Sequence, residues 1–388
     1  MVKWIAISLL WLSINSFGQT ITLSPEAEVS VITCGPGQEE LYTAFGHSAI
    51  RVVDPQNGID YAYNYGVFDF SQPNFYLNYT RGLLLFKLGV YAYPDFVNSY
   101  GYYKRWVTEQ VLNLSQNQKQ QVFDFLEWNA LPENETYRYD YFYNNCANKV
   151  RDVFAETLKD SIRFDGTYIT TDYTIRQLTD LYLKEQPWGD LGIDICLGLP
   201  IDKKATPYEY MYLPDYVLSS FNHATIRRNG KELPLVKNQR QVLPNIQVET
   251  KKAFAHPSTV MLGFVALALL LSMYDIRRKK PSLWFDALLF GVSGIVGLLL
   301  VVLWTATDHA AAAKNFNLLW ALPTNILMIG IISSRFRPFL RKYALAATVL
   351  SFALLATWSL LPQQLNTVLL PLVGVLGMRS FLLWRYMR

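Results

Sequence analysis

Two residues in the first half of the chain have the types and the local settings of a thiol nucleophile and its base. Cys146 follows two asparagines at a point where the pattern predicts that a helix begins. The dipole and the unpaired N–H groups of a helix N-terminus favour a thiolate, and the same groups can stabilise an oxyanion. His47 follows Gly46 at the front of a predicted strand, and the chain holds only four histidines. Such a His and Cys can form a thiolate–imidazolium pair, whereas a buried Cys and a hydrogen-bonded structural His are the alternative.

The elements that must position this pair are predicted from short local patterns. Residues 29–33, 48–53 and 60–65 alternate or are rich in β-branched side chains, which predicts three strands. Residues 115–130 and 147–158 carry apolar side chains at helical spacing, which predicts two helices. Asn229-Gly230 between 224–228 and 232–236 is typical of a tight hairpin. The sequence therefore predicts a mixed α+β domain at 19–236, long enough for one sizeable core.

The remaining apolar segments predict an export signal and a membrane domain. An apolar run at 4–12 follows Lys3 and ends in small residues, which predicts a signal peptide at 1–18; a retained membrane anchor is the alternative. Later runs approach the length of about 20 residues that crosses a bilayer. There are five of them, at 258–276, 283–305, 318–333, 343–361 and 365–384, the last interrupted by Arg379. A polar linker is predicted at 237–256 and a membrane domain of about five helices at 257–388.

The charges are divided unevenly between the two parts and predict the orientation. Residues 256–388 hold twelve Lys/Arg and three acids, whereas residues 1–255 hold 23 Lys/Arg and 28 acids. Basic clusters follow the first, third and fifth runs, and the positive-inside rule places them in the cytoplasm. Residues 19–256 then lie on the other side, as the signal peptide also requires. No basic cluster lies on the front part, so the sequence predicts no nucleic-acid partner. A soluble domain with buried helices is the alternative.

Aromatic residues gather in the exported part. Fourteen of the 25 tyrosines lie between Tyr61 and Tyr143, and segment 74–107 mixes them with Leu, Phe and a few basic residues. Tyrosine favours surfaces that are half apolar and half wet, including the bilayer interface. This composition fits a surface that rests on lipid head groups; an aromatic core and rim is the alternative.

The other two cysteines are candidates for a disulfide. An exported protein normally pairs its cysteines, and three cannot all pair within one chain. Cys34 and Cys196 are the pair that leaves Cys146 free. Two buried free thiols, or Cys34 as the nucleophile, are the alternatives.

The order of a strand His, a polar strand and a helix-opening Cys resembles the circularly permuted NlpC/P60 (papain-like) thiol proteins, which include the lecithin–retinol acyltransferase family. Longer motifs also occur. Those of the exported part are Thr33-Cys34-Gly35-Pro36-Gly37-x-Glu39-x-Leu41-Tyr42-x-x-Phe45-Gly46-His47-Ser48-Ala49-Ile50-Arg51-Val52, then Tyr63-Asn64-Tyr65-Gly66-x-Phe68-Asp69-Phe70, then Tyr143-x-Asn145-Cys146. Those of the membrane part are Thr307-Asp308-His309 and Asn315-Phe316-Asn317-Leu318-Leu319-Trp320. With these motifs, nearly the whole chain resembles the Lnb family, the Bacteroidetes-type lipoprotein N-acyltransferases.

The resemblance implies roles for individual residues. Cys146 would be the nucleophile and His47 its base, and Asn64 is our choice for the third polar group that orients the imidazole. Arg51 lies two turns of the pleat beyond His47, on the same face of a regular strand, and could meet a phosphate or form a surface ion pair. Further candidates for substrate binding are Tyr63, Tyr143, Asn145, His309, Asn315 and Asn317. Their alternatives are a helix cap for Tyr143 and Asn145 and an ordinary solvated loop for the last three.

The implied function is N-acylation of the N-terminal S-diacylglyceryl cysteine of bacterial lipoproteins. A phospholipid or another acyl lipid would give its acyl chain to Cys146 as a thioester, and the lipoprotein amine would accept it. The implied location is the bacterial inner membrane, crossed several times, with the catalytic domain in the periplasm. A cell-wall cysteine hydrolase of the NlpC/P60 type and a non-catalytic membrane sensor are the alternatives. The sequence holds no nucleotide loop, metal-ligand cluster or flavin fingerprint, so no cofactor and no metal are predicted.

Overall fold

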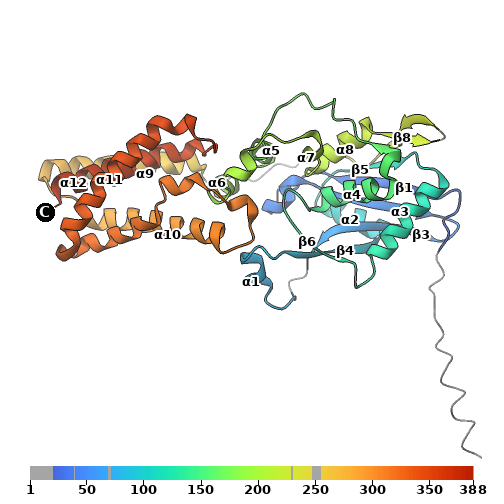
Figure 1. The fold of residues 1–388 in the computed structure, drawn as a ribbon, viewed down its shortest axis with the longest axis horizontal. Coiled ribbons are helices and arrows are strands. Elements are labelled where there is room, and N and C mark those ends of the chain that lie inside the picture. Colours follow the sequence, from blue (N-terminus) through green and yellow to red (C-terminus); the bar gives the residue numbers. More distant parts are fainter. Residues whose placement is uncertain (1–20, 39, 69–70, 229, 247–254, 388) are drawn as a thin grey trace, which may run out of the picture.

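The fold was obtained as a computed structural model that describes residues 21–38, 40–68, 71–228, 230–246 and 255–387. Two bodies lie end to end: a mixed α and β domain and a bundle of long helices (Figure 1). The predicted signal peptide at 1–18 and the hairpin residue Asn229 lie outside the described residues.

A seven-stranded antiparallel sheet is the centre of the N-terminal domain. Its strand order is β10-β5-β1-β2-β3-β4-β6. The bounds are β1 Glu28–Cys34, β2 His47–Asp54, β3 Ile59–Val67, β4 Leu85–Ala92, β5 Val107–Leu112, β6 Thr136–Arg138 and β10 Val236–Leu243. The central strands β1 and β2 pair Cys34 with His47 at one end and Glu28 with Val53 at the other. The predicted strands at 29–33, 48–53 and 60–65 are therefore confirmed as β1, β2 and β3.

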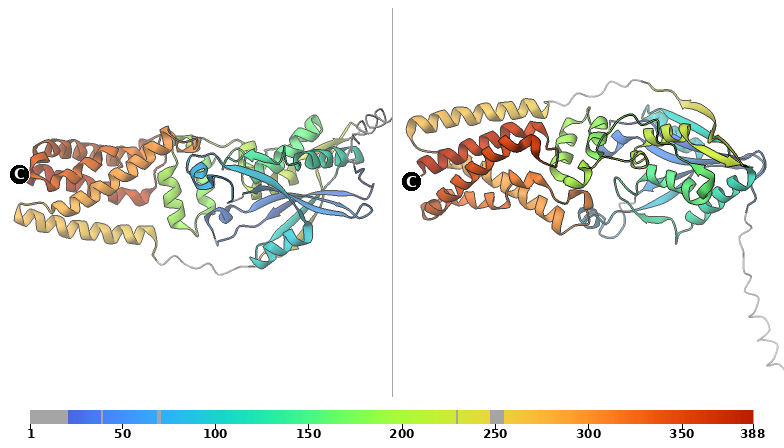
Figure 2. Two further views of the ribbon diagram at one scale, coloured as in Figure 1. Left: turned by 90° about the horizontal axis from the view of Figure 1, so that it is seen from below. Right: turned by 45° about the horizontal axis from the view of Figure 1, so that its top comes forward.

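Helices cover both faces of this sheet (Figure 2). The N-terminal domain holds α1 Phe75–Thr80, α2 Tyr93–Tyr102, α3 Gln116–Asn129, α4 Cys146–Leu158, α5 Ile175–Tyr182, α6 Pro187–Cys196, α7 Pro207–Tyr210 and α8 Pro214–His223. Helices α3, α4 and α8 pack on one face over a core that includes Val31, Tyr63 and Phe154. Helix α2 packs on the other face with Ala49 and Ala62. Helices α3 and α4 confirm the two predicted helices.

A small second sheet has the order β7-β8-β9, with bounds Ile162–Arg163, Thr225–Arg228 and Lys231–Pro234. Strands β8 and β9 confirm the predicted hairpin. Strand β10 corrects the predicted linker at 237–256, because residues 237–243 pair with β5 at the sheet edge. Polar side chains suit an exposed edge strand, and this explains why the sequence showed no apolar pattern there.

The C-terminal bundle contains four continuous long helices, namely α9 Pro257–Arg278, α10 Leu283–Thr305, α11 Arg337–Thr357 and α12 Leu370–Tyr386. All four are long and apolar enough to cross a membrane, or belong to segments that are. The predicted span at 318–333 is different, because residues 310–319 and 323–332 form two pieces that meet at 43°. Pro323 begins the second piece, and proline restricts the residue before it and lacks the N–H that a continuous helix needs.

Arg379 does not disrupt the last helix, because its charge is neutralised inside the bundle. Its guanidinium is fully buried and lies 2.7 Å from Asp286 on α10 and 2.7 Å from Asp275 on α9. Ser272 accepts a further hydrogen bond from it at 3.0 Å. Charged groups at membrane depth commonly pair in this way, so this network clamps three helices together.

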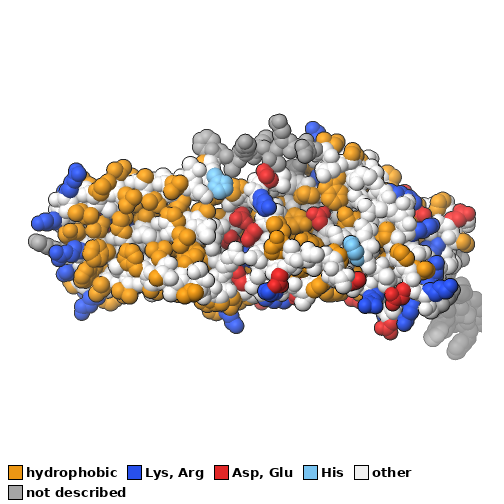
Figure 3. Space-filling model, turned by 90° about the horizontal axis from the view of Figure 1, so that it is seen from above, with side chains coloured by type: hydrophobic (Ala, Val, Ile, Leu, Met, Phe, Trp, Pro, Cys, Tyr) orange, Lys and Arg blue, Asp and Glu red, His pale blue; other side chains and the backbone are white. Residues whose placement is uncertain are grey.

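The outer surface of the bundle separates apolar and basic side chains. Figure 3 shows hydrophobic side chains over the helices and Lys or Arg at the end remote from the N-terminal domain. The exposed apolar residues include Leu262, Leu288 and Val349, on α9, α10 and α11. This distribution fits a bundle whose sides lie in lipid.

Candidate thiol site

Cys146 is the first residue of α4, as its predicted position requires. Asn145 caps the helix: its Oδ1 accepts the N–H of Asn148 at 3.0 Å, and the Asn148 side chain accepts the N–H of Asn145 at 3.0 Å. The Asn145 amide also donates to the carbonyls of Tyr141 and Tyr212. This double cap fixes the start of the helix, so the thiol is held at the positive end of the helix dipole.

His47 opens β2, and its ring is oriented by the neighbouring strand. The Asn64 side-chain oxygen on β3 accepts a hydrogen bond from His47 Nε2 at 2.5 Å. Asn64 therefore lies where the third polar group was expected, and its catalytic role stays a prediction. Tyr100 of α2 stacks parallel to the imidazole, with ring centroids 6.3 Å apart and planes inclined by 20°. The imidazole is therefore fixed from two directions.

The thiol and the imidazole share one space beside Gly66. Gly66 has φ of +93°, and a Cβ built on it would lie 3.6 Å from Cys146 Cβ and 3.9 Å from His47 Cε1. The side chains of Cys146 and His47 are hydrogen-bonded to one another. The positive φ therefore favours glycine at this place, and a Cβ there would make ordinary van der Waals contact with both side chains.

The two groups shift each other's pKa in the directions of an ion pair. Burial alone would raise the pKa of the Cys146 thiol, but the charge and hydrogen bond of His47 and the N–H groups of Ser48 and Ala147 lower it below the ordinary value. Burial alone would lower the pKa of His47, but the charge and hydrogen bond of Cys146 and the bond to Asn64 raise it. The arrangement therefore favours a thiolate and an imidazolium.

The N–H groups of Ser48 and Ala147 also provide a place for negative charge. Both donate toward the sulfur, one from β2 and one from the first turn of α4. Donors in such positions can stabilise the oxyanion that forms when a thiolate attacks an acyl carbonyl. Cys146, His47 and Asn64 are all partly exposed, so the site is open to a substrate.

Arg51 has a structural role, which corrects its predicted part in substrate binding. Its guanidinium lies 2.8 Å from Asp60 and 3.0 Å from Glu109, and stacks 3.7 Å over the Tyr93 ring. These partners use both edges and one face of the guanidinium. The ion pair that the sequence left open as an alternative is the observed state, with the difference that Glu109 is buried.

Tyr63 and Asn145 also differ from their predicted roles. Tyr63 is fully buried on the α3 side of the sheet and donates its hydroxyl proton to Glu127 at 2.5 Å. Alternation along β3 puts it on the face opposite Asn64, so it cannot meet a substrate at the thiol. Asn145 is the helix cap described above. Tyr143 is 46% exposed beside Lys203, and its substrate role stays a prediction.

Asn315 and Asn317 join the two domains. The Asn315 amide donates to the carbonyls of Ile195 and Cys196, and the Asn317 amide donates to those of Asp194 and Ile195. Both side chains are buried against the last turn of α6, so their predicted contact with a substrate is corrected to domain docking. His309 lies partly exposed in the same loop, and its role stays a prediction.

Cys34 and Cys196 do not form the predicted disulfide, because all three cysteines are free. Cys34 ends β1 beside His47, where burial raises the pKa of its thiol to about 12. Cys196 ends α6 against the bundle, where Asn315 binds its carbonyl. Two free thiols, the alternative left open by the sequence, is the observed state.

Among the described residues, one group of side chains has the composition of a metal site. It comprises Asp180, Asp190 and Asp194, whose carboxylate oxygens lie within 4.8 Å of one another. Burial and the neighbouring acids raise the pKa of Asp180 to about 8 and that of Asp190 to about 6. Arg176 already pairs with Asp194 at 2.6 Å, so the cluster belongs to the ion-pair network at the domain junction.

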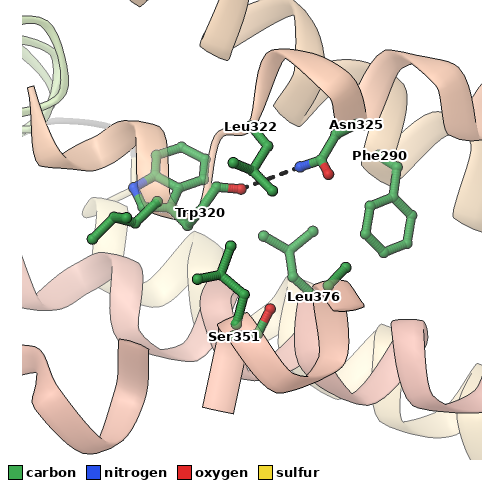
Figure 4. Close-up of a pocket in the computed structure, with 9 residues that line it drawn as sticks. Phe290, Trp320, Leu322, Asn325, Ser351 and Leu376 are labelled. Carbon is green, nitrogen blue, oxygen red and sulfur yellow. Dashed lines mark hydrogen bonds between the residues drawn. The ribbon is translucent and has the colours of Figure 1, made fainter. Parts of the chain in front are cut away.

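Two cavities in the described part lie away from the thiol. One is inside the bundle and is lined by Phe290, Trp320, Asn325 and Leu376; there Asn325 donates to the Trp320 carbonyl at 3.2 Å (Figure 4). The other lies at the domain junction, where Asp202 and Gln363 contribute to its wall. Neither of the two is lined by Cys146 or His47.

Sequence reasoning missed several neighbours of the pair. Tyr100 stacks on the imidazole, and the charge of Cys146 contributes to the raised pKa of Tyr137 and Tyr139. The charge of Arg105 acts on both Cys34 and His47. The concentration of tyrosine between 61 and 143 was the signal that could have found the aromatic members. No local pattern distinguishes Arg105 from a surface arginine.

The described features define a membrane protein whose extramembrane domain carries a thiol–imidazole pair. Residues 19–180 match the Lnb N-terminal periplasmic domain, and residues 249–388 match the Lnb transmembrane domain. The chain belongs to the Lnb family, and its N-terminal domain is periplasmic. Neither the curated proteins nor the solved structures gave a match.

Proposed function

We propose that this protein transfers an acyl chain from a membrane lipid to the α-amine of the N-terminal S-diacylglyceryl cysteine of a lipoprotein. The observation that carries the proposal is the Cys146–His47 pair, oriented by Asn64 and supplied with two N–H donors. A thiol with these neighbours can hold an acyl group as a thioester. The membrane bundle supports this proposal, since both the donor and the acceptor are lipids.

The first half-reaction forms the thioester. The Cys146 thiolate attacks the ester carbonyl of the donor, and the resulting oxyanion is stabilised by the N–H groups of Ser48 and Ala147. The C–O bond then breaks, and the leaving alkoxide of the lysolipid takes a proton from the His47 imidazolium. His47 is left neutral, with Asn64 holding the ring in place.

The second half-reaction forms the amide. The neutral amine of the lipoprotein attacks the thioester carbonyl, and His47 accepts its proton. The C–S bond breaks and restores the thiolate beside an imidazolium. One nucleophile and one base thus serve both steps, and the balanced cycle needs no cofactor.

The proposal also includes the fold of the periplasmic domain and the orientation of the bundle in the membrane. The strand His that precedes the helix Cys fits a permuted NlpC/P60 fold, and the basic end of the bundle fits an inner membrane with that end in the cytoplasm. A cell-wall hydrolase of the same fold would use the same pair, but it has no need of the bundle.

The test is to incubate the purified protein with phospholipid alone and measure the mass of the peptide that contains Cys146. We expect one added acyl chain, which neutral hydroxylamine removes because thioesters are labile to it. A peptide with a free S-diacylglyceryl cysteine should discharge the chain and gain an amide-linked acyl group.

Cys146→Ala should lose this adduct, whereas Cys196→Ala should keep it, because Cys196 is a free, partly exposed thiol in another setting. An adduct that persists in Cys146→Ala, or one that never passes to the amine, would contradict the proposed function. Hydrolysis of a cell-wall peptide without any lipid adduct would favour the hydrolase.

A further inference from the structure

Helix α1 is a short helix that buries none of its own side chains, although several are large and apolar. Tyr76 is 75% exposed, Leu77 56% and Tyr79 44%. We call these three residues the α1 surface. The helix continues from a ring cluster in which Phe75 contacts Phe68, and Phe68 contacts Phe86. An apolar group of this kind on a soluble surface usually marks a contact with a partner or a membrane.

The α1 surface lies where the second span leaves the bundle. Helix α10 ends at Thr305, and the N–H of Asp308 soon after it donates to the carbonyl of Arg81, the C-cap of α1, at 2.8 Å. Gly82 has φ of +78°, and a Cβ there would lie 2.9 Å from the His309 nitrogen. These backbone contacts hold α1 beside the end of α10 (Figures 1 and 2).

This position coincides with the interfacial belt of the bundle. Trp304, in the last turn of α10, is 42% exposed, and tryptophan and tyrosine concentrate where a span meets the head groups. Segment 71–92 contains two bases and no acid; Lys87 pairs with Glu135, whereas Arg81 is exposed. The composition and charge therefore suit a layer of phosphate head groups above acyl chains.

We propose that the α1 surface is inserted into the head-group layer of the periplasmic leaflet and binds phospholipid there. Tyr76 and Leu77 contact the acyl chains, and Arg81 faces the phosphates. The ligand of the α1 surface is lipid of the same bilayer that the bundle crosses, because α1 lies beside the end of α10.

A chain of contacts leads from the α1 surface to the thiol. The Tyr79 hydroxyl is hydrogen-bonded to the Tyr141 hydroxyl at 2.8 Å, and the Tyr141 carbonyl accepts the amide of Asn145, which precedes Cys146. Tyr139 lies between the Tyr141 ring, at 5.5 Å, and the Phe86 ring, at 4.3 Å.

We infer from this continuity that the α1 surface presents the phospholipid donor to Cys146. This second step rests on the proposed function, whereas membrane insertion of α1 does not.

The insertion is tested by cross-linking. The full-length protein carries a benzophenone amino acid at Leu77 and is placed in phosphatidylethanolamine–phosphatidylglycerol vesicles. Irradiation should add a phospholipid to the peptide containing residue 77. The matched control is the same amino acid at Tyr61, which is 41% exposed and pairs with Ala92, at the end of β4 opposite Leu85. A cross-link to a second copy of the chain or to another protein, or a lipid yield no higher than at Tyr61, would overturn the proposal.

Donor delivery is tested with Y76E/L77E and the control Y61E. Loading of Cys146 from vesicle phospholipid should slow at least about tenfold in the double variant, because carboxylates oppose insertion into the interface. Loading from water-soluble p-nitrophenyl butyrate measures the thiol chemistry separately. With this donor, the loading rate of Y76E/L77E should equal that of Y61E. Equal vesicle loading in both variants would overturn delivery. Failure of the unmodified protein to load from either donor would refute the proposed function and leave the cross-link to decide on insertion.

Discussion

Replacement of His47 by glutamine tests whether the imidazole creates the reactive thiolate. In His47→Gln the thiol loses the charge and the hydrogen bond that lower its pKa, and retains the N–H groups of Ser48 and Ala147. Burial, the largest single influence, raises the pKa and is unchanged. The pKa of Cys146 should therefore move from below the ordinary value of 9.0 to above it.

This upward shift of the Cys146 pKa determines how the alkylation rate depends on pH. A thiol with a pKa of 9 or more is at most about 1% thiolate at pH 7, so alkylation of the variant by iodoacetamide at pH 7 should be at least about tenfold slower. The inflection of the alkylation rate with pH should move upward. Acyl transfer should fall further, by at least about 100-fold, because His47 also carries the proton in both half-reactions.

The assay follows the mass of the Cys146 peptide between pH 5 and pH 10. His223→Gln is the matched control, because His223 bonds its own helix at Ser219 and stacks on Tyr168. An alkylation profile in His47→Gln that matches this control would refute the thiolate–imidazolium pair. Equal losses in alkylation and acyl transfer would refute the proton-carrying role.

Three other variants test separate parts of the structure. Gly66→Ala should slow loading of Cys146 by at least about tenfold, because φ of +93° strains an alanine in a segment that contacts both Cys146 and His47. Gly58→Ala, with φ of +66° and open space, should retain the rate. Arg51→Met should reduce the free energy of unfolding, measured by thermal unfolding, by roughly 3 kcal/mol, because Glu109 loses its closest cation. A change in phospholipid affinity without lost stability would instead support the predicted role of Arg51 in phosphate binding. Asn317→Ala should accelerate hydrogen exchange at the end of α6 and not in α3, since the Asp194 carbonyl loses its side-chain donor and the Ile195 carbonyl keeps only Asn315; equal exchange in the two helices would contradict the docking role.

The parts of the site that the sequence predicted depend on local signals. An asparagine before a helix and a glycine before a strand are short-range patterns, and they located Cys146 and His47. The strand alternation that placed Asn64 beside His47 should also have excluded Tyr63, because adjacent residues point to opposite faces.

The remaining errors have long-range causes. The role of Arg51 depends on Glu109 in β5, a strand that was not predicted, and Asn317 depends on α6, more than 100 residues away. Likewise, β10 carries no apolar alternation, because the pairing with β5 decides its structure. The break at Pro323 was readable from the proline alone, but a continuous apolar run concealed it.

The docking of α6 has a consequence for biogenesis. The Asn366 amide donates to Asp194 at 2.9 Å across 172 residues of sequence, and the Gln363 amide donates to the Leu197 carbonyl at 3.0 Å. Ribosomes add about 5 to 20 residues per second, so the acidic end of α6 waits on the order of 10 to 30 s for these partners. During that interval Asp194 has Arg176 as its companion. A nascent chain arrested before residue 315 lacks these partners and the amides of Asn315 and Asn317, so it should expose α6 to protease, and release from the arrest should protect it.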